Sequence, residues 1–266
     1  MLRDVAFGPD PGRYPLPTDE NCVGRWHRAV ALGGQGRYAQ ARAELAVLRR
    51  PGVRPAVAAL AASTQASLLR QLGFHAHASG YDGAALALAG ASGDGPAADP
   101  LLHEARCDAF TGLAADALGC GRLPLGHRML QRCRQYLDDV DTPDTLWRQY
   151  IRLHWVSAEI ALAAGDFETA TVHARDAVAR AADAPSVRHR VKSALLSAAA
   201  ATGQATPDVA HETARQVLDD CGEHGLLPLR WAAAMLLDGV RPDPSARAIR
   251  DDCAAEIARR GGRFTK

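Results

Sequence analysis

The stretch Gly165-Asp-Phe-Glu-Thr-Ala170 decides the fold, because it joins two segments whose apolar residues recur at helical spacing. Glycine readily adopts the left-handed conformation that ends many helices, so Gly165 predicts a helix end. Phe167 follows two residues later, and we expect its ring to fill the junction between the two helices. Ala158 and Ala170 are small enough for the two backbones to approach closely. The stretch therefore predicts a helical hairpin.

The same pattern recurs along the chain at intervals of about 40 residues, a length typical of helical repeats. The four clearer copies each have a turn glycine, a small residue seven positions earlier and another five positions later. The copies are centred on Gly36, Gly73, Gly121 and Gly165, with a weaker one on Gly203. A single hairpin cannot bury its apolar face alone, so we expect successive hairpins to stack side by side.

Over residues 22–220 these repeats resemble the tetratricopeptide repeat (TPR) superfamily, most clearly at Gly165 to Ala170. The chain is similar to TPR-like proteins of actinobacteria. The resemblance implies an all-α fold, a right-handed α-α superhelix (TPR-like solenoid) of about five helical hairpins plus C-terminal capping helices. The C-terminal part also resembles the helical-repeat regions of ATP-dependent LuxR-type regulators, which suggests transcriptional or stress regulation as the setting.

Two regions are expected along the chain. Residues 1–20 contain four prolines and little apolar content, which predicts an extended or disordered N-terminal arm. Residues 21–262 are predicted to form a single TPR-like helical-repeat domain, because every periodic segment there has helical spacing. We find no alternating apolar pattern that would predict a strand.

Composition and charge exclude several classes of protein. The net charge of +1 argues against a strongly basic nucleic-acid-binding surface. No stretch approaches the roughly 18 apolar residues of a membrane helix, and the first ten residues lack the apolar core of a signal peptide. The six cysteines form no C-x-x-C pair and are expected to be reduced thiols. These observations predict a cytoplasmic protein without a membrane partner.

No enzyme motif is found in the sequence. A phosphate-binding G-x-x-x-x-G-K-[ST] loop, an H-E-x-x-H metal motif and a G-x-S-x-G nucleophile are all missing. His75 and His77 come closest to a metal-binding pair, but two positions apart they point to different sides of a helix. We therefore expect no catalytic residue, no metal site and no cofactor.

In the TPR family the first helix of each hairpin lines a concave groove that binds a partner peptide, so the resemblance implies such a groove here. Counted back from each turn glycine, the groove-facing positions carry polar and aromatic side chains that core packing does not explain. The predicted groove residues are Trp26, Ser63, Ser67, Arg70, Asp108, Thr111, Arg152, Trp155, Glu159, Arg190, Ser193 and Ser197.

The basic and aromatic groove residues suggest roles in binding. Arg70, Arg152 and Arg190 are expected to bind acidic groups or a C-terminal carboxylate, because guanidinium forks match carboxylate geometry. Trp26 and Trp155 are expected to be exposed anchors for apolar side chains. The alternative is that both tryptophans are buried and that the charged residues simply face water.

The run Arg188-His-Arg-Val-Lys192 is the densest basic patch of the sequence. One interpretation is a solvated helix start. The other is one end of an anion-binding or carboxylate-binding groove, since arginine suits both ligands.

These patterns predict a non-catalytic protein–protein interaction module that binds a segment of an unidentified protein or peptide, with acidic groups, in its concave groove. An alternative is a ligand-responsive regulator whose groove binds a small anionic signal or a signalling peptide. An enzymatic function is a further alternative, because an active site assembled from several helices leaves no local sequence motif. Neutral charge and the lack of repeated base-reading side chains argue against RNA as a partner. A homo-oligomer is compatible with the sequence.

Overall fold

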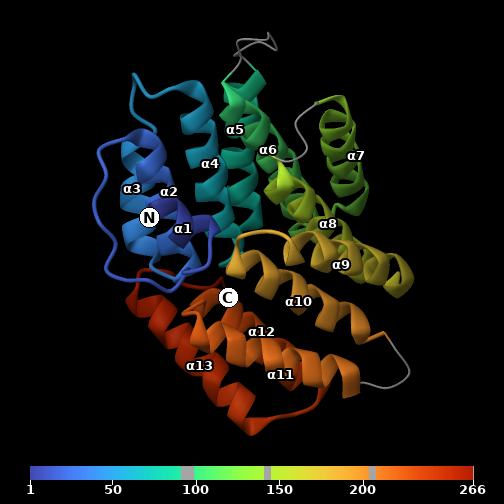
Figure 1. The fold of residues 1–266 in the computed structure, drawn as a ribbon. Coiled ribbons are helices and arrows are strands. Elements are labelled where there is room, and N and C mark those ends of the chain that lie inside the picture. The colour runs from blue at the N-terminus through green and yellow to red at the C-terminus, as the bar shows by residue number, and fades with distance from the viewer. Residues whose placement is uncertain (91–98, 141–144, 204–207, 266) are drawn as a thin grey trace.

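A computed structural model describes residues 1–90, 99–140, 145–203 and 208–265 of the chain. All regular structure in these ranges is helical, which confirms the all-α prediction (Figure 1). No helix in these ranges combines the length and apolar character needed to cross a membrane. The helices are α1 Leu2–Phe7, α2 Cys22–Gly34, α3 Tyr38–Val47, α4 Pro55–Arg70, α5 His75–Gly90, α6 Pro100–Gly119, α7 Leu123–Asp139, α8 Trp147–Ala163, α9 Phe167–Ala182, α10 Val187–Ala201, α11 Asp208–Glu223, α12 Leu227–Val240 and α13 Pro244–Arg259.

Helices α2 to α13 pack in chain order as hairpins, from α2–α3 to α12–α13. Four of the hairpins turn at the predicted glycines, because Gly36, Gly73, Gly121 and Gly165 all have φ between +71° and +88°. Residues with a β-carbon rarely adopt this conformation, so glycine fixes the ends of the first helices. The predicted turns are confirmed at these four glycines, whereas Gly203 has no positive φ.

The aromatic residue after the turn behaves differently in two of the hairpins. Tyr38 is fully buried, and its hydroxyl donates a hydrogen bond to Gln71 Oε1 over 3.0 Å, as expected of a ring that fills a junction. Phe167 is 39 % exposed, so the corresponding prediction for its ring is wrong. The ring instead occupies the space beside Gly203 at the end of α10, where a β-carbon would lie 2.2 Å from Phe167 Cγ.

Close approach of α5 and α6 depends on Gly112. A β-carbon at Gly112 would lie 2.1 Å from Oδ2 of Asp82, a carboxylate that is fully buried and held by hydrogen bonds from Ser63 and Arg70. We expect Gly112→Ala to lower the free energy of unfolding by about 2–3 kcal/mol through overpacking.

Gly80→Ala in α5 is the matched control, because a β-carbon there meets no atom within 4 Å. The same substitution should raise the free energy of unfolding by about 0.5–1 kcal/mol through helix propensity alone. Urea unfolding of both variants measures the contrast. A Gly112→Ala variant as stable as the unchanged protein would contradict the close approach.

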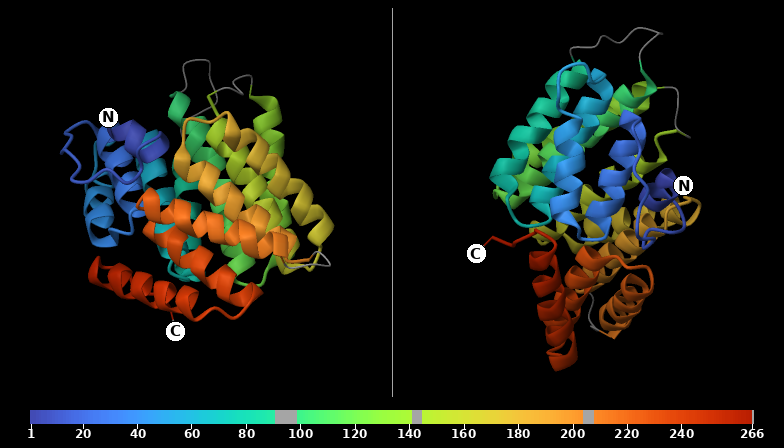
Figure 2. Two further views of the ribbon diagram at one scale, coloured as in Figure 1. Left: turned by 60° about the horizontal axis from the view of Figure 1, so that its bottom comes forward. Right: turned by 90° about the vertical axis from the view of Figure 1, so that its left-hand side faces the viewer.

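The first helices of successive hairpins also contact one another: α2 contacts α4, α4 contacts α6, α6 contacts α8, α8 contacts α10, and α10 contacts α12. These helices form a continuous inner wall, while α7, α9 and α13 lie on the outside of the row (Figure 2). Polar residues of the first helices are thereby brought together from distant parts of the sequence.

The N-terminal arm is more structured than the sequence predicted. The apolar residues of Leu2–Phe7 form α1, and the Phe7 ring packs 5.5 Å from the Trp26 ring, so an extended or disordered arm is wrong for these residues. The prolines that guided the prediction all follow this helix. Beyond α1, the carbonyl oxygen of Gly8 accepts a hydrogen bond from Val187 N over 3.2 Å.

The last hairpin returns to the first. Arg260 Nη1 donates to the carbonyl oxygen of Gln35 over 2.7 Å, and Ala39 N donates to the carbonyl oxygen of Arg260 over 3.0 Å. Further along, Thr265 N donates to the carbonyl oxygen of Leu72 over 2.9 Å. The row of hairpins therefore closes on itself, with the inner wall facing the enclosed space.

Candidate functional site: an arginine-rich cavity

A cavity of about 590 Å³ lies inside the inner wall. Its lining comes from the first helices α2, α4, α6, α8, α10 and α12, together with His75 at the start of α5 and Phe264 of the C-terminal segment. Helix α8, at the middle of the row, supplies three of the six Arg, Lys and Glu side chains in the lining.

Half of the predicted groove residues line this cavity, and three more line a smaller one beside it. The main cavity is lined by Ser67, Arg70, Thr111, Arg152, Trp155 and Glu159. The smaller cavity, about 60 Å³, is lined by Trp26, Ser63 and Asp108. The two cavities share Arg148, Arg152 and Arg188, so they belong to one site.

The three predicted residues of α10 lie elsewhere. Arg190 is exposed and donates to the carbonyl oxygen of Ala184 over 2.8 Å. Ser193 is fully buried behind the wall, and neither cavity includes Ser197. Counting back from Gly203 gave the wrong face, because α10 turns Arg188, Lys192 and Leu195 toward the cavity.

Arg70 is neutralised by two buried aspartates. Its Nη1 donates to Asp82 Oδ2 over 2.9 Å and to Asp116 Oδ1 over 2.5 Å. Ser63 Oγ donates to the other oxygen of Asp82 over 2.8 Å. Burial raises the pKa of Asp82 to about 7 although Arg70 opposes the shift, and burial also raises the pKa of Asp116. Arg70 therefore holds α4, α5 and α6 together.

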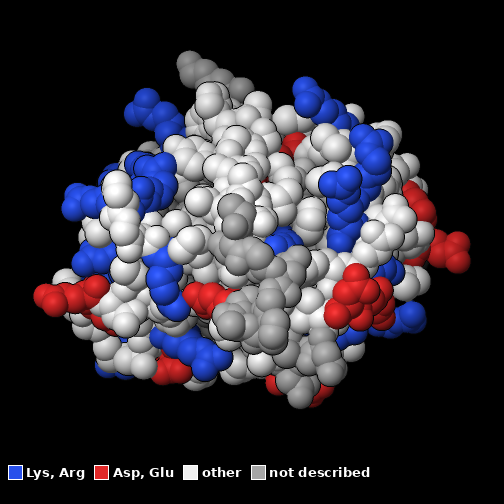
Figure 3. Space-filling view, turned by 90° about the horizontal axis from the view of Figure 1, so that it is seen from above, with Lys and Arg blue, Asp and Glu red and all other residues white. Residues whose placement is uncertain are grey.

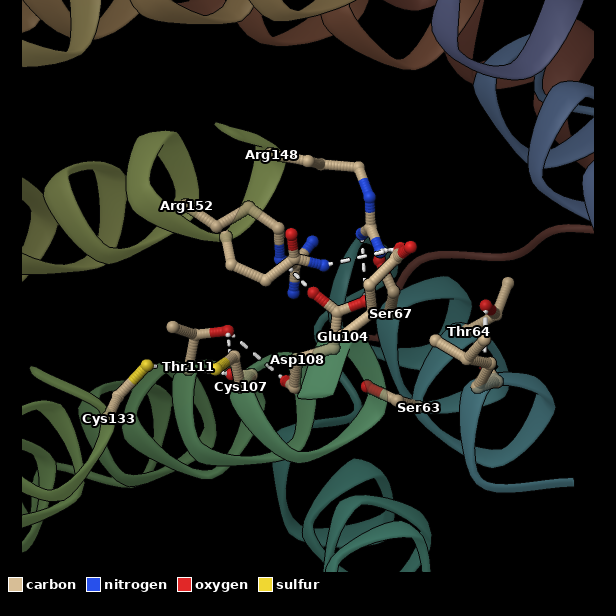
Figure 4. A network of polar contacts seen from close by, with 12 residues as sticks. Ser63, Thr64, Ser67, Glu104, Cys107, Asp108, Thr111, Cys133, Arg148 and Arg152 are labelled. Carbon is tan, nitrogen blue, oxygen red and sulfur yellow. Dashed lines mark hydrogen bonds and ion pairs between the residues drawn. The ribbon is translucent and has the colours of Figure 1, made fainter. Parts of the chain in front are cut away.

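A second network connects α6 and α8 (Figure 4). Arg148 Nη1 donates to Asp108 Oδ2 over 2.8 Å, and Arg148 Nη2 donates to Glu104 Oε2 over 2.7 Å. Arg152 Nε lies 3.1 Å from Asp108 Oδ1 as an ion pair, and Arg152 makes no hydrogen bond to the described residues. Burial disfavours the charged form of the Arg148 guanidinium, but the neighbouring carboxylates of Asp108 and Glu104 outweigh this effect and raise its pKa.

Arg188 adds a third guanidinium to this network without adding an acid. Its one hydrogen bond among the described residues goes from Nη1 to the carbonyl oxygen of Val30 over 3.3 Å, and no described carboxylate forms an ion pair with it. Burial lowers the pKa of Arg188 to about 10, and the charges of Arg148 and Arg152 lower it further in the same direction. Three guanidinium groups therefore share two carboxylates, and Arg188 is the one without an ion pair to a described carboxylate.

Aromatic rings line the cavity next to this charge. Trp155 stacks on His189 with ring centroids 5.1 Å apart, and Trp231 stacks on Phe264 at 4.2 Å. Burial lowers the pKa of His189 far below its usual value, and the nearby Arg188 adds to this effect, so the ring is neutral. The walls thus combine positive charge with flat apolar surfaces.

The two tryptophans predicted as exposed anchors are both buried. Trp26 is 2 % exposed, and its Nε1 donates to Thr64 Oγ1 over 2.9 Å. Trp155 is 9 % exposed and donates to Ser193 Oγ over 2.8 Å. Indole N–H groups that are hydrogen-bonded inside the protein are typical of tryptophans packed in a core. The alternative interpretation, that both tryptophans are buried, is therefore correct.

The lining of the main cavity contains five Arg or Lys side chains and one acidic side chain, that of Glu159. The face seen in Figure 3 carries basic and acidic side chains with uncharged surface between them. The net charge of the chain is only +1. Guanidinium groups beside aromatic rings form a site that can bind a carboxylate or phosphate attached to an apolar group.

Several cavity residues were missing from the sequence prediction, namely Arg148, Arg188, Lys192, Trp231 and Phe264. The basic run from Arg188 to Lys192 was one available signal, because one of its two interpretations placed it at the end of an anion-binding groove. Trp231 and Phe264 carried no such signal, since their position depends on the return of the last hairpin to the first. The chain matches no protein-family model, and no curated protein matches it.

Proposed function

We propose that the chain is a non-catalytic binding module that takes a segment of a partner polypeptide into its inner cavity and holds a carboxylate of that segment between Arg152 and Arg188. The observation that carries this proposal is the cluster of three guanidinium groups with two carboxylates at the cavity wall. An incoming carboxylate supplies Arg188 with an anionic partner and offers two oxygen acceptors.

A TPR-like right-handed superhelix is part of the same proposal. The glycine turns at regular positions and the contacts between successive first helices support it. In such an arrangement the first helices face the ligand, which agrees with the origin of the cavity lining. The six free cysteines support a cytoplasmic setting, where thiols stay reduced.

A second hollow favours a polypeptide as the ligand. It measures about 600 Å³, runs along α12 and shares Trp231 and Ala232 with the main cavity. Its lining includes Met235, which is 45 % exposed. A segment whose carboxylate lies at Arg188 can pass over Trp231 and place apolar side chains along α12.

The test uses short apolar peptides with a free carboxyl terminus and the same peptides with an amidated end. We expect the free peptides to bind in calorimetric titration and the amidated peptides to bind at least about tenfold more weakly, since a charged hydrogen bond contributes about 1.5–3 kcal/mol. Arg188→Gln should weaken the free peptides by a similar factor. Equal binding by both kinds of peptide would contradict the role of the carboxylate.

Arg190→Gln is the matched control, because Arg190 lies on the same helix but is exposed and outside the cavity. It should leave peptide binding unchanged. A loss of affinity in Arg190→Gln as large as that in Arg188→Gln would point to general charge attraction and would overturn the proposed contact.

A small anionic signal is the second candidate, and the cavity volume of about 590 Å³ favours it. Small-molecule sites are typically about 300–1,000 Å³. A ligand that binds only the folded state raises the melting temperature by mass action. Stabilisation by nucleotides, acyl phosphates or small carboxylates, without stabilisation by peptides, would identify a ligand-responsive regulator. Stabilisation by peptides alone supports the binding module.

A further inference from the structure

Outside the cavity, three potential metal ligands come together between α8 and α9. They are His154 of α8 and His173 and Asp176 of α9. One ligand atom from each residue lies within 4.8 Å of the others, and this is the one group of its kind among the described residues. None of the three lines the cavity, so the group is independent of the proposed binding function.

The spacing of the ligand atoms matches a single metal ion. His154 Nδ1 lies 3.1 Å from His173 Nδ1 and 3.7 Å from Asp176 Oδ2. With metal–nitrogen bonds of about 2.0–2.1 Å, two histidine nitrogens on one ion lie roughly 3.0–3.4 Å apart, depending on the coordination geometry. The two nitrogens are therefore already as far apart as two nitrogens bound to one ion. A small rotation of the Asp176 side chain would bring its carboxylate within bonding distance of that ion.

The chemistry of the donors fits a borderline divalent ion. Two imidazoles and one carboxylate are ligands that Zn²⁺ and its neighbours in the first transition row accept, with at least one position left for water. Each neutral imidazole can present Nδ1 as a ligand atom in the tautomer that carries its proton on Nε2, so an ion can take the place of the proton now shared between the two Nδ1 atoms. Asp176 is 45 % exposed, which gives an ion a path from solvent.

We propose that His154, His173 and Asp176 form a binding site for a divalent transition-metal ion of the Zn²⁺ type. The ion replaces the His154–His173 hydrogen bond and joins the two helices of the hairpin. Two cations act against it, because Arg134 of α7 and Arg180 of α9 both add positive charge near His154. The site is thus expected to bind more weakly than the same ligands would alone.

Calorimetric titration of the metal-free full chain with ZnCl₂ tests the site. We expect one ion per chain, and a loss of affinity of at least about tenfold in His173→Gln and in Asp176→Asn. Asp176 is only partly buried, so its variant is expected to fold, which circular dichroism checks. His77→Gln in α5 is the matched control for loss of a histidine, and Cys120→Ser controls for the exposed thiol.

Arg134→Gln adds a test of opposite sign. Removing a nearby positive charge should tighten Zn²⁺ binding by about two- to fivefold, as expected for a partly screened charge. Unchanged Zn²⁺ affinity in both His173→Gln and Asp176→Asn would overturn the site and leave a plain histidine–histidine hydrogen bond. So would an equal loss in His77→Gln.

Discussion

Replacing Arg70 by methionine is expected to lower the free energy of unfolding by about 3–5 kcal/mol at pH 8, the range for breaking a buried ion pair from one side. Arg70 is the cation that faces Asp82 and Asp116, which are 0 % and 1 % exposed. Methionine fills similar space but leaves both carboxylates without a partner charge. Urea unfolding monitored by circular dichroism measures the loss.

The size of this loss should depend on pH, because protonation removes the charge that Arg70 balances. At pH 5, below the raised pKa of about 7, Asp82 takes up a proton, so the loss in Arg70→Met should be smaller than at pH 8. The double variant Arg70→Met with Asp82→Asn should recover part of the stability. Arg190→Met, at an exposed position, should change little. A loss in Arg70→Met that is the same at both pH values would contradict the buried charge network.

The second large effect is the pH dependence that Asp82 contributes. Its pKa is raised from 3.8 to about 7 by burial, so the folded protein holds this proton more tightly than the unfolded chain. The contribution of Asp82 to stability is fully present below about pH 4 and is lost as the pH rises through 7. At about 1.4 kcal/mol per pKa unit, the loss across this window amounts to roughly 4 kcal/mol.

The comparison must be made with Asp82→Asn rather than on the pH curve alone. Burial lowers the pKa of His27 to about 4, so the contribution of His27 to the free energy of unfolding is lost as the pH falls through the same range. This change is opposite in direction to that of Asp82. Both proteins contain His27, so its effect cancels in their difference. We expect Asp82→Asn to gain stability relative to the unchanged protein from pH 4 to pH 8. A constant difference would show that Asp82 keeps the same pKa in both states.

The hairpins could be predicted from the sequence because their markers are local. A turn glycine needs only its own backbone geometry, so Gly36, Gly73, Gly121 and Gly165 identified the ends of four helices directly. Counting residues back from a correctly predicted turn glycine then identified the face of the first helix that points into the cavity. This succeeded for Arg152, Glu159 and their neighbours, which line the cavity.

Counting back from the turn glycine failed in α10, where the repeat pattern around the glycine was weak. In α10 the reference was Gly203, and the predicted face missed Arg188 and Lys192. The partners of Arg70 were also beyond reach, since Asp82 and Asp116 lie 12 and 46 residues further along the chain. Which arginine is balanced by buried acids and which remains open to a ligand depends on the packing of several helices.

The return of the last hairpin to the first also limits how this protein can evolve. Linear stacks of repeats lengthen by duplication, since each unit touches only its neighbours. Here an additional helix pair inserted near the middle would separate Arg260 from Gln35 and break the seam between α13 and the turn after α2. We therefore expect this closed row to tolerate an added helix pair less well than an open stack does, while substitutions in the cavity lining leave the seam in place.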